Sequence, residues 1–98
     1  MDFEEFSKSI STMLEPPAEI SLCLQALWWA KKGDWCSAHD IAQEIIEPNG
    51  SWVHAYLHRV EGDIGNAGYW YSKAGKPSKT NESLTEEWEE ITRCLLTS

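Results

Sequence analysis

The chain has 98 residues, which suit one domain over residues 1–98 and are too few for an elaborate active site with a separate cofactor domain. Its 8 Lys and Arg against 16 Asp and Glu give a formal net charge of -8, so nucleic acid and anionic membranes would have to bind against electrostatic repulsion. We therefore expect neutral or basic partners, and neither a nucleic acid nor a membrane.

Two amphipathic helices are predicted before Gly33. In residues 3–14, apolar side chains recur every three or four positions, and Pro16-Pro17 ends the pattern. The next segment, from Glu19 to Lys32, is apolar on more than one side, which is typical of a central helix. Gly33 follows it and suits the left-handed backbone that stops a helix.

A third helix is predicted from Trp35 to Ile46, with Asp34 as its N-cap and Pro48-Asn49-Gly50 as the turn that closes a first helical hairpin. Ser51 is then the predicted N-cap of a fourth helix, from Trp52 to Glu61. Each of these helices would begin with a side-chain oxygen that accepts a hydrogen bond from a free backbone N–H group.

The second predicted hairpin repeats the pattern of the first. Gly62-Asp63 supplies a stop and a cap, and a fifth helix is predicted from Ile64 to Ala74. Residues 76–82 are polar, so we predict a surface loop. Ser83-Leu84-Thr85-Glu86 has the form of a capping box and starts a last amphipathic helix. Its apolar positions are Leu84, Trp88, Ile91 and Leu95.

Residues 26–38 and 55–67 are similar to each other at a period of 29 residues. A period of this size is typical of helical hairpins that bury their apolar faces against one another. The two units resemble tetratricopeptide repeats in the spacing of Gly33, Trp35, Ala38, Ala42 and Ile45, of Gly62, Ile64, Ala67, Tyr71 and Ala74, and of the small Ala26 and Ala55. Residues 66–75 also resemble the A-x-Y-W-Y-x-K-A core of Sel1-like repeats.

Residues 52–71 resemble a family of small all-helical proteins that carry the block W-x-H-A-x-L-H-R-x-E-G-D…N-A-x-Y-W-Y. This resemblance implies a helical fold and a region of functional interest, and it implies no particular reaction. The predicted fold is therefore an all-α, right-handed stack of two helical hairpins, similar to tetratricopeptide repeats, with flanking N- and C-terminal helices.

The cysteines and the apolar segments bear on the cellular compartment. Three Cys residues without a CxxC spacing argue against a disulfide framework or a zinc knuckle. No apolar run approaches the roughly 20 residues needed to span a bilayer, and the acidic start of the chain differs from a secretory signal. We expect a cytoplasmic protein with reduced cysteines.

One predicted helix carries candidate metal ligands. His54, His58 and Glu61 lie at positions i, i+4 and i+7, so their side chains form a single stripe. Imidazole and carboxylate groups are ligands of zinc and non-haem iron. The H-E-x-x-H motif of metalloproteases is absent, and Asp63 is the next candidate ligand.

The same residues have two other interpretations. In the repeat register His58 corresponds to Trp29, which favours packing, with neutral imidazoles bonded to neighbouring polar groups. Alternatively, His58, Arg59 and Glu61 form a polar network that holds a loop, with Arg59 able to bind a carboxylate.

Three consecutive aromatic residues suggest an interaction surface. Tyr69, Trp70 and Tyr71 cannot all face one core, because successive helical residues point about 100° apart. Exposed aromatic side chains beside charged ones are typical of interface anchors. The leading hypothesis is a non-catalytic, adaptor-like module that binds a protein or peptide through the contact residues Trp52, Arg59, Trp70 and Tyr71.

Homodimerisation is one way to cover the open ends of a stack with only two hairpins. The leading hypothesis requires no cofactor and no metal. The alternative is a small metal-dependent or ligand-binding enzyme that uses His54, His58, Glu61 and Asp63.

Two further groups of ionisable residues are predicted to have no catalytic role. Glu86-Glu87 and Glu89-Glu90 are assigned to the solvated face of the last helix. Cys36 and His39, at i and i+3, are predicted to share packing and not a nucleophilic mechanism.

Overall fold

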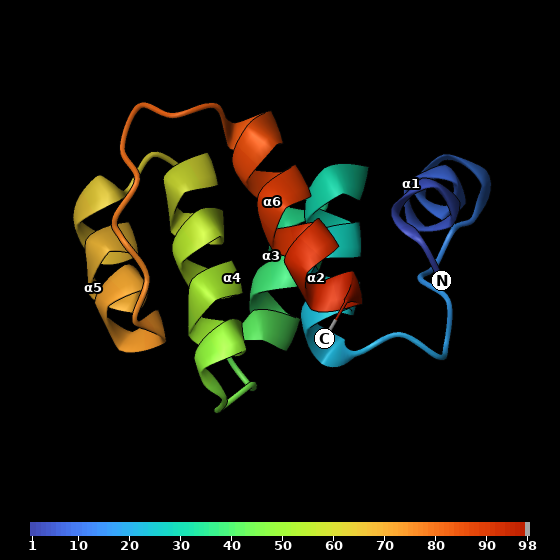
Figure 1. The fold of residues 1–98 in the computed structure, drawn as a ribbon, viewed down its shortest axis with the longest axis horizontal. Helices are drawn as coiled ribbons and strands as arrows, with labels where there is room; N and C mark the ends of the chain where they lie inside the picture. The colour runs from blue at the N-terminus through green and yellow to red at the C-terminus, as the bar shows by residue number, and fades with distance from the viewer. Residues whose placement is uncertain (98) are drawn as a thin grey trace.

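The computed structural model describes residues 1–97, and this part of the chain folds entirely into helices and connecting loops (Figure 1). The helices are α1 (Phe3–Thr12), α2 (Leu22–Lys32), α3 (Trp35–Ala42), α4 (Pro48–Val60), α5 (Ile64–Ala74) and α6 (Leu84–Leu96). The predicted all-α class is confirmed.

The helices form two stacked hairpins with a flanking helix at each end of the chain. α2 pairs with α3, α4 pairs with α5, and α3 packs against α4 to join the hairpins. α6 lies across α2 and α4, and α1 packs against α2 and α6 at the opposite end of the molecule from α5 (Figure 1). The predicted arrangement of two hairpins and two flanking helices is therefore confirmed.

Local signals set the hairpin turns where the sequence places them. Gly33 and Gly62 take the left-handed conformation directly after α2 and α4, with φ of 98° and 88°. The Asp34 and Asp63 side chains then accept hydrogen bonds from the backbone N–H groups of Ser37 and Asn66. Repetition of this stop and cap gives the two hairpins similar turns.

The link between the hairpins differs from the prediction. α3 ends at Ala42 instead of Ile46, and α4 begins at Pro48 instead of Trp52. Pro48-Asn49-Gly50 is the first turn of α4 and not a loop, because Pro lacks an N–H group and has a fixed φ that suits the start of a helix. Ser51 therefore lies inside α4 and is not its cap.

Gly50 has a packing role in this link. A Cβ atom on Gly50 would lie 2.5 Å from the Ile45 Cβ atom, well inside van der Waals contact. The absent side chain therefore lets α4 start directly beside the end of the first hairpin.

Tryptophans fill much of the core, and their indole N–H groups have partners. The fully buried Trp28 donates to the Ser9 hydroxyl at 2.9 Å, which docks α1 on α2. Trp88 of α6 donates to the Leu27 carbonyl at 2.8 Å. Both flanking helices are thus fixed to α2 by apolar packing and by a specific hydrogen bond. Within residues 1–97, none of the helices has the length and apolar content needed to cross a lipid bilayer.

Candidate functional site

All three histidines of the chain meet at the junction of the two hairpins. His39 comes from α3, and His54 and His58 come from α4. The Nε2 atoms of His39 and His54 lie 2.9 Å apart, and one ring nitrogen from each histidine lies within 4.8 Å of the others. We refer to His39, His54 and His58 as the histidine cluster.

Two indole rings hold the cluster in place. Trp35 stacks on His39, with ring centroids 4.7 Å apart and an interplanar angle of 13°. Trp70 stacks on His54 at 3.9 Å and 15°. The Trp35 indole is itself anchored, because its N–H group donates to the Leu57 carbonyl at 2.7 Å. The imidazole orientations are therefore constrained by packing from α3, α4 and α5.

The environment keeps His54 neutral. This residue is 5 % exposed, and burial, followed by the positive charges that His39 and His58 can carry, lowers the pKa of His54 to about 4. A neutral imidazole has a free lone pair on one ring nitrogen. In the contact between His39 and His54, one Nε2 atom must donate and the other accept. A metal ion that binds both atoms would replace this proton.

Glu61 orients the third imidazole. His58 Nδ1 donates to the Glu61 carboxylate at 2.5 Å, which leaves the lone pair of the neutral ring on Nε2. The His58 side chain is buried, whereas the Glu61 side chain is 39 % exposed. Arg59 bonds to other groups, so the predicted network of His58, Arg59 and Glu61 is split into two separate interactions.

Asp63 lies beside His58 and Glu61 for a different reason. The side chains of these three residues also come within 4.8 Å of one another, but both carboxylates are on exposed residues. The Asp63 carboxylate caps α5 through the Asn66 N–H group at 3.2 Å. The cap and the hydrogen bond from His58 to Glu61 therefore account for the proximity of these groups.

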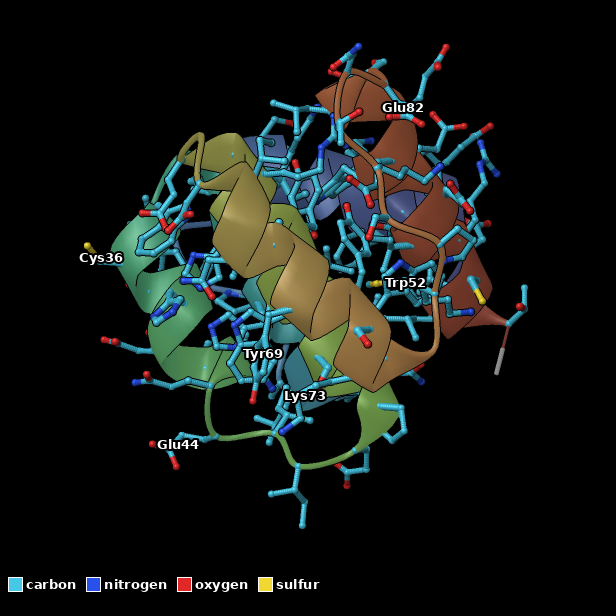
Figure 2. All side chains as sticks on the ribbon, turned by 90° about the vertical axis from the view of Figure 1, so that its left-hand side faces the viewer. Cys36, Glu44, Trp52, Tyr69, Lys73 and Glu82 are labelled. Atoms are coloured by element: carbon cyan, nitrogen blue, oxygen red, sulfur yellow. The ribbon has the colours of Figure 1, made fainter. Side chains whose placement is uncertain are left out.

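Three of the four predicted contact residues are buried. Trp52, Arg59 and Tyr71 are each less than a tenth exposed, which corrects their assignment to an interaction surface. Trp70 is half-buried and stacks on His54. In this aromatic segment it is Tyr69, 57 % exposed, that lies at the surface of α5 (Figure 2).

Arg59 belongs to a buried polar network on the other side of α4. Its guanidinium donates to the Glu87 carboxylate and to the backbone oxygens of Thr80 and Glu82. The Tyr71 hydroxyl donates to the second Glu87 oxygen at 2.5 Å. Because Glu87 is only 1 % exposed, its assignment to the solvated face of the last helix is wrong. The network therefore holds the loop before α6 against α4 and α5, the two helices of the second hairpin.

Sequence reasoning missed His39 as a member of the site. The sequence pairs His39 with Cys36, one turn earlier, but Cys36 is exposed at the outer edge of α3 (Figure 2). The predicted stacking of the two hairpins was the signal that would have found His39, because it places α3 beside α4. The rotation of α3 about its axis depends on tertiary packing.

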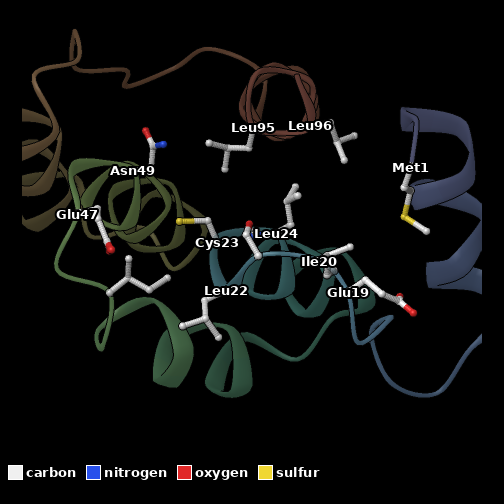
Figure 3. A pocket seen from close by; sticks show the side chains of 12 residues that line it. Met1, Glu19, Ile20, Leu22, Cys23, Leu24, Glu47, Asn49, Leu95 and Leu96 are labelled. Carbon is white, nitrogen blue, oxygen red and sulfur yellow. Dashed lines mark hydrogen bonds between the residues drawn. The ribbon is translucent and has the colours of Figure 1, made fainter. Parts of the chain in front are cut away.

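A separate apolar groove lies where α2 and α4 begin and α6 ends (Figure 3). It has a volume of about 580 Å³. Leu24 of α2 points toward Leu95 and Leu96 of α6 (Figure 3), and Leu22 and Cys23 also line the groove. Two carboxylates, those of Glu19 and Glu47, also line the groove, and its described lining includes no Lys or Arg side chain.

Comparisons with protein-family models, with curated proteins and with solved structures find no match for this chain.

Proposed function

We propose that this protein binds a divalent transition-metal ion, of which Zn²⁺ is the simplest case, at the histidine cluster. The observation that carries the proposal is the convergence of His39, His54 and His58 from two hairpins. Neutral imidazole is a preferred ligand of zinc, copper, nickel and iron. The proposal adds His39 to the predicted His54 and His58, and it moves Glu61 and Asp63 out of the ligand set.

The distance between the His39 and His54 ring nitrogens supports this proposal, and a ring nitrogen of His58 lies within 4.8 Å of them. Zinc–nitrogen bonds of about 2.0–2.1 Å at a tetrahedral angle separate two ligand nitrogens by about 3.3 Å. The Nε2 atoms of His39 and His54 are 2.9 Å apart, so the two rings need to separate by only a few tenths of an ångström. The flanking indoles reduce the entropy that the histidines lose on binding, because the rings are already ordered.

Metal analysis of the purified, tag-free protein tests the proposal. After exposure to Zn²⁺ and removal of excess ion, elemental analysis and native mass spectrometry should give one Zn²⁺ per chain. His39→Ala and His58→Ala should lose this ion and remain folded. Cys36→Ser is the matched control, because Cys36 lies on the same helix outside the cluster. No retained ion in the wild type, or equal retention in both histidine variants, would contradict the proposal.

A second candidate function uses the groove between α2, α4 and α6. We propose that it binds a peptide segment with apolar side chains and a nearby Lys or Arg, since apolar side chains and two carboxylates line the groove. This keeps the adaptor hypothesis but moves the contact surface away from the aromatic segment. The free cysteines fit the proposed cytoplasmic setting.

Labelled model peptides test this second function. A peptide of alternating Leu and Lys should bind with a measurable change in fluorescence anisotropy, and its Leu/Glu counterpart should not. Leu22→Glu, at an exposed position of the groove, should abolish the binding. Equal binding of both peptides would show nonspecific adhesion, and a dimer in native mass spectrometry that Leu22→Glu dissociates would assign the groove to a second copy of the chain.

A further inference from the structure

We infer that a metal ion in the histidine cluster keeps one coordination position open for a small exogenous ligand, with water or hydroxide as the resting occupant. This inference rests on the proposed metal site. Structural zinc sites are closed by four protein ligands, whereas catalytic sites have three protein ligands and an exchangeable fourth position. The question is therefore whether a fourth protein atom completes the cluster.

The described residues offer three ligand atoms in this cluster and no fourth. Of His, Cys, Asp and Glu side chains, only His39, His54 and His58 bring ligand atoms together here. Trp35 and Trp70 cover the faces of two imidazoles, but an indole N–H group is a donor and cannot bind a cation through nitrogen. The Trp35 N–H group is in any case bonded to the Leu57 carbonyl.

Glu61 is the nearest competitor for the fourth position, and its hydrogen bond to His58 argues against it. The Glu61 carboxylate bonds to Nδ1 of His58, while the lone pair of the neutral ring is on Nε2. The two nitrogens of an imidazole point away from each other, so when His58 binds the ion through Nε2, the carboxylate on Nδ1 lies behind the ring. This is the arrangement of a carboxylate that orients a metal ligand from outside the coordination sphere.

The packing around the cluster limits the size of the exogenous ligand. His54 and His58 are 5 % and 6 % exposed, and indoles stack on His39 and His54. Such packing leaves no room for a bulky chelating ligand and limits the exogenous ligand to the size of water, hydroxide or a small anion. A water bound to a metal ion in a three-histidine site ionises near neutral pH, because the cation stabilises hydroxide. With a metal ion bound, the open position would hold a metal-activated water or hydroxide that could act as a nucleophile.

Cobalt substitution tests the inference separately from the proposed function. Co²⁺ reports its coordination by visible absorption, and azide is the probe ligand. The cobalt-loaded wild type should show bands that shift saturably with azide, and a reversible shift between about pH 6 and pH 9 as the bound water ionises. Glu61→Ala, saturated with Co²⁺ to offset its weaker metal binding, should still show a saturable azide shift, since Glu61 lies outside the coordination sphere.

Each other outcome has a distinct meaning. If the wild type retains no Co²⁺, the proposed metal site fails, and this inference fails with it. If Co²⁺ is retained but the spectrum is insensitive to azide and pH, the site is closed and the inference alone is overturned. If azide shifts the spectrum only in Glu61→Ala, Glu61 is the fourth ligand, and the inference is again overturned.

Discussion

The Nε2 atoms of His39 and His54 lie 2.9 Å apart, although the two residues belong to different hairpins. This contact joins α3 to α4 at the junction that holds the stack together. A metal ion at this position would cross-link the two hairpins. Metal binding and stability should therefore be thermodynamically linked.

Zn²⁺ should raise the free energy of unfolding of the wild type. An ion that binds the folded state at a free concentration 100 times its dissociation constant adds about 2.7 kcal/mol. Urea denaturation with and without Zn²⁺ measures this gain. His39→Ala should show little or no gain, while Cys36→Ser should keep it. The same gain in all three proteins would place the binding site elsewhere.

Loss of Glu61 should weaken metal binding without removing it. The Glu61 carboxylate holds His58 in the tautomer with a lone pair on Nε2, and loss of such an orienting partner typically costs about 10–100-fold in affinity. Isothermal titration calorimetry should therefore give a weaker dissociation constant for Glu61→Ala and a smaller loss for Glu61→Gln. Glu44→Gln, at an exposed position in the turn after α3, is the control. Unchanged affinity in Glu61→Ala would rule out an orienting role.

The metal-free protein should lose stability as the pH falls from about 6.5 to about 4. Burial lowers the pKa of His54 from 6.5 to about 4 in the folded state, so over this range the unfolded chain binds a proton that the folded chain does not. The corresponding loss is on the order of 3 kcal/mol. Urea denaturation at several pH values should show a shallower pH dependence in His54→Phe than in the wild type. Parallel curves would show that His54 does not contribute.

Breaking the buried pair of Arg59 and Glu87 should be strongly destabilising. Both side chains are buried, and removal of one leaves the other charge without its partner, which typically costs about 3–5 kcal/mol. Glu87→Ala should therefore shift the urea midpoint far more than Tyr71→Phe, which removes one hydrogen bond. Glu86→Ala, at the exposed neighbouring position, should change stability by about 0.5 kcal/mol or less. Similar effects at positions 86 and 87 would contradict the buried network.

Local features of the sequence account for most of the helix boundaries. Gly33, Asp34, Asp63 and Ser83 act through their own backbone conformation or through hydrogen bonds three residues away, so their roles are readable without a fold. Gly50 is different, because its proximity to Ile45 is a packing contact between the first turn of α4 and the link that precedes this helix. In the sequence, a Gly after Pro-Asn resembles a turn. In the structure, this Gly allows the backbone of α4 to lie close to the Ile45 side chain.

The candidate site depends on contacts that no local pattern specifies. His54 and His58 were found from their spacing on one helix, but His39 joins them only through the packing of α3 on α4. The charged neighbours of Glu87 in the sequence are typical of a solvent-exposed helix face. Glu87 is buried because it pairs with Arg59, which lies 28 residues earlier. The rotation of each helix in the stack is set by the whole core, so both residues needed the tertiary structure.

X-ray absorption spectroscopy of the Zn²⁺-loaded protein identifies the ligand atoms of the ion. The spectrum should show a first shell of three imidazole nitrogens and one further light atom at about 2.0–2.1 Å, with the outer-shell scattering of histidine rings. A sulfur ligand at about 2.3 Å, or a shell of oxygen atoms without imidazole scattering, would contradict the assignment of the ion to His39, His54 and His58.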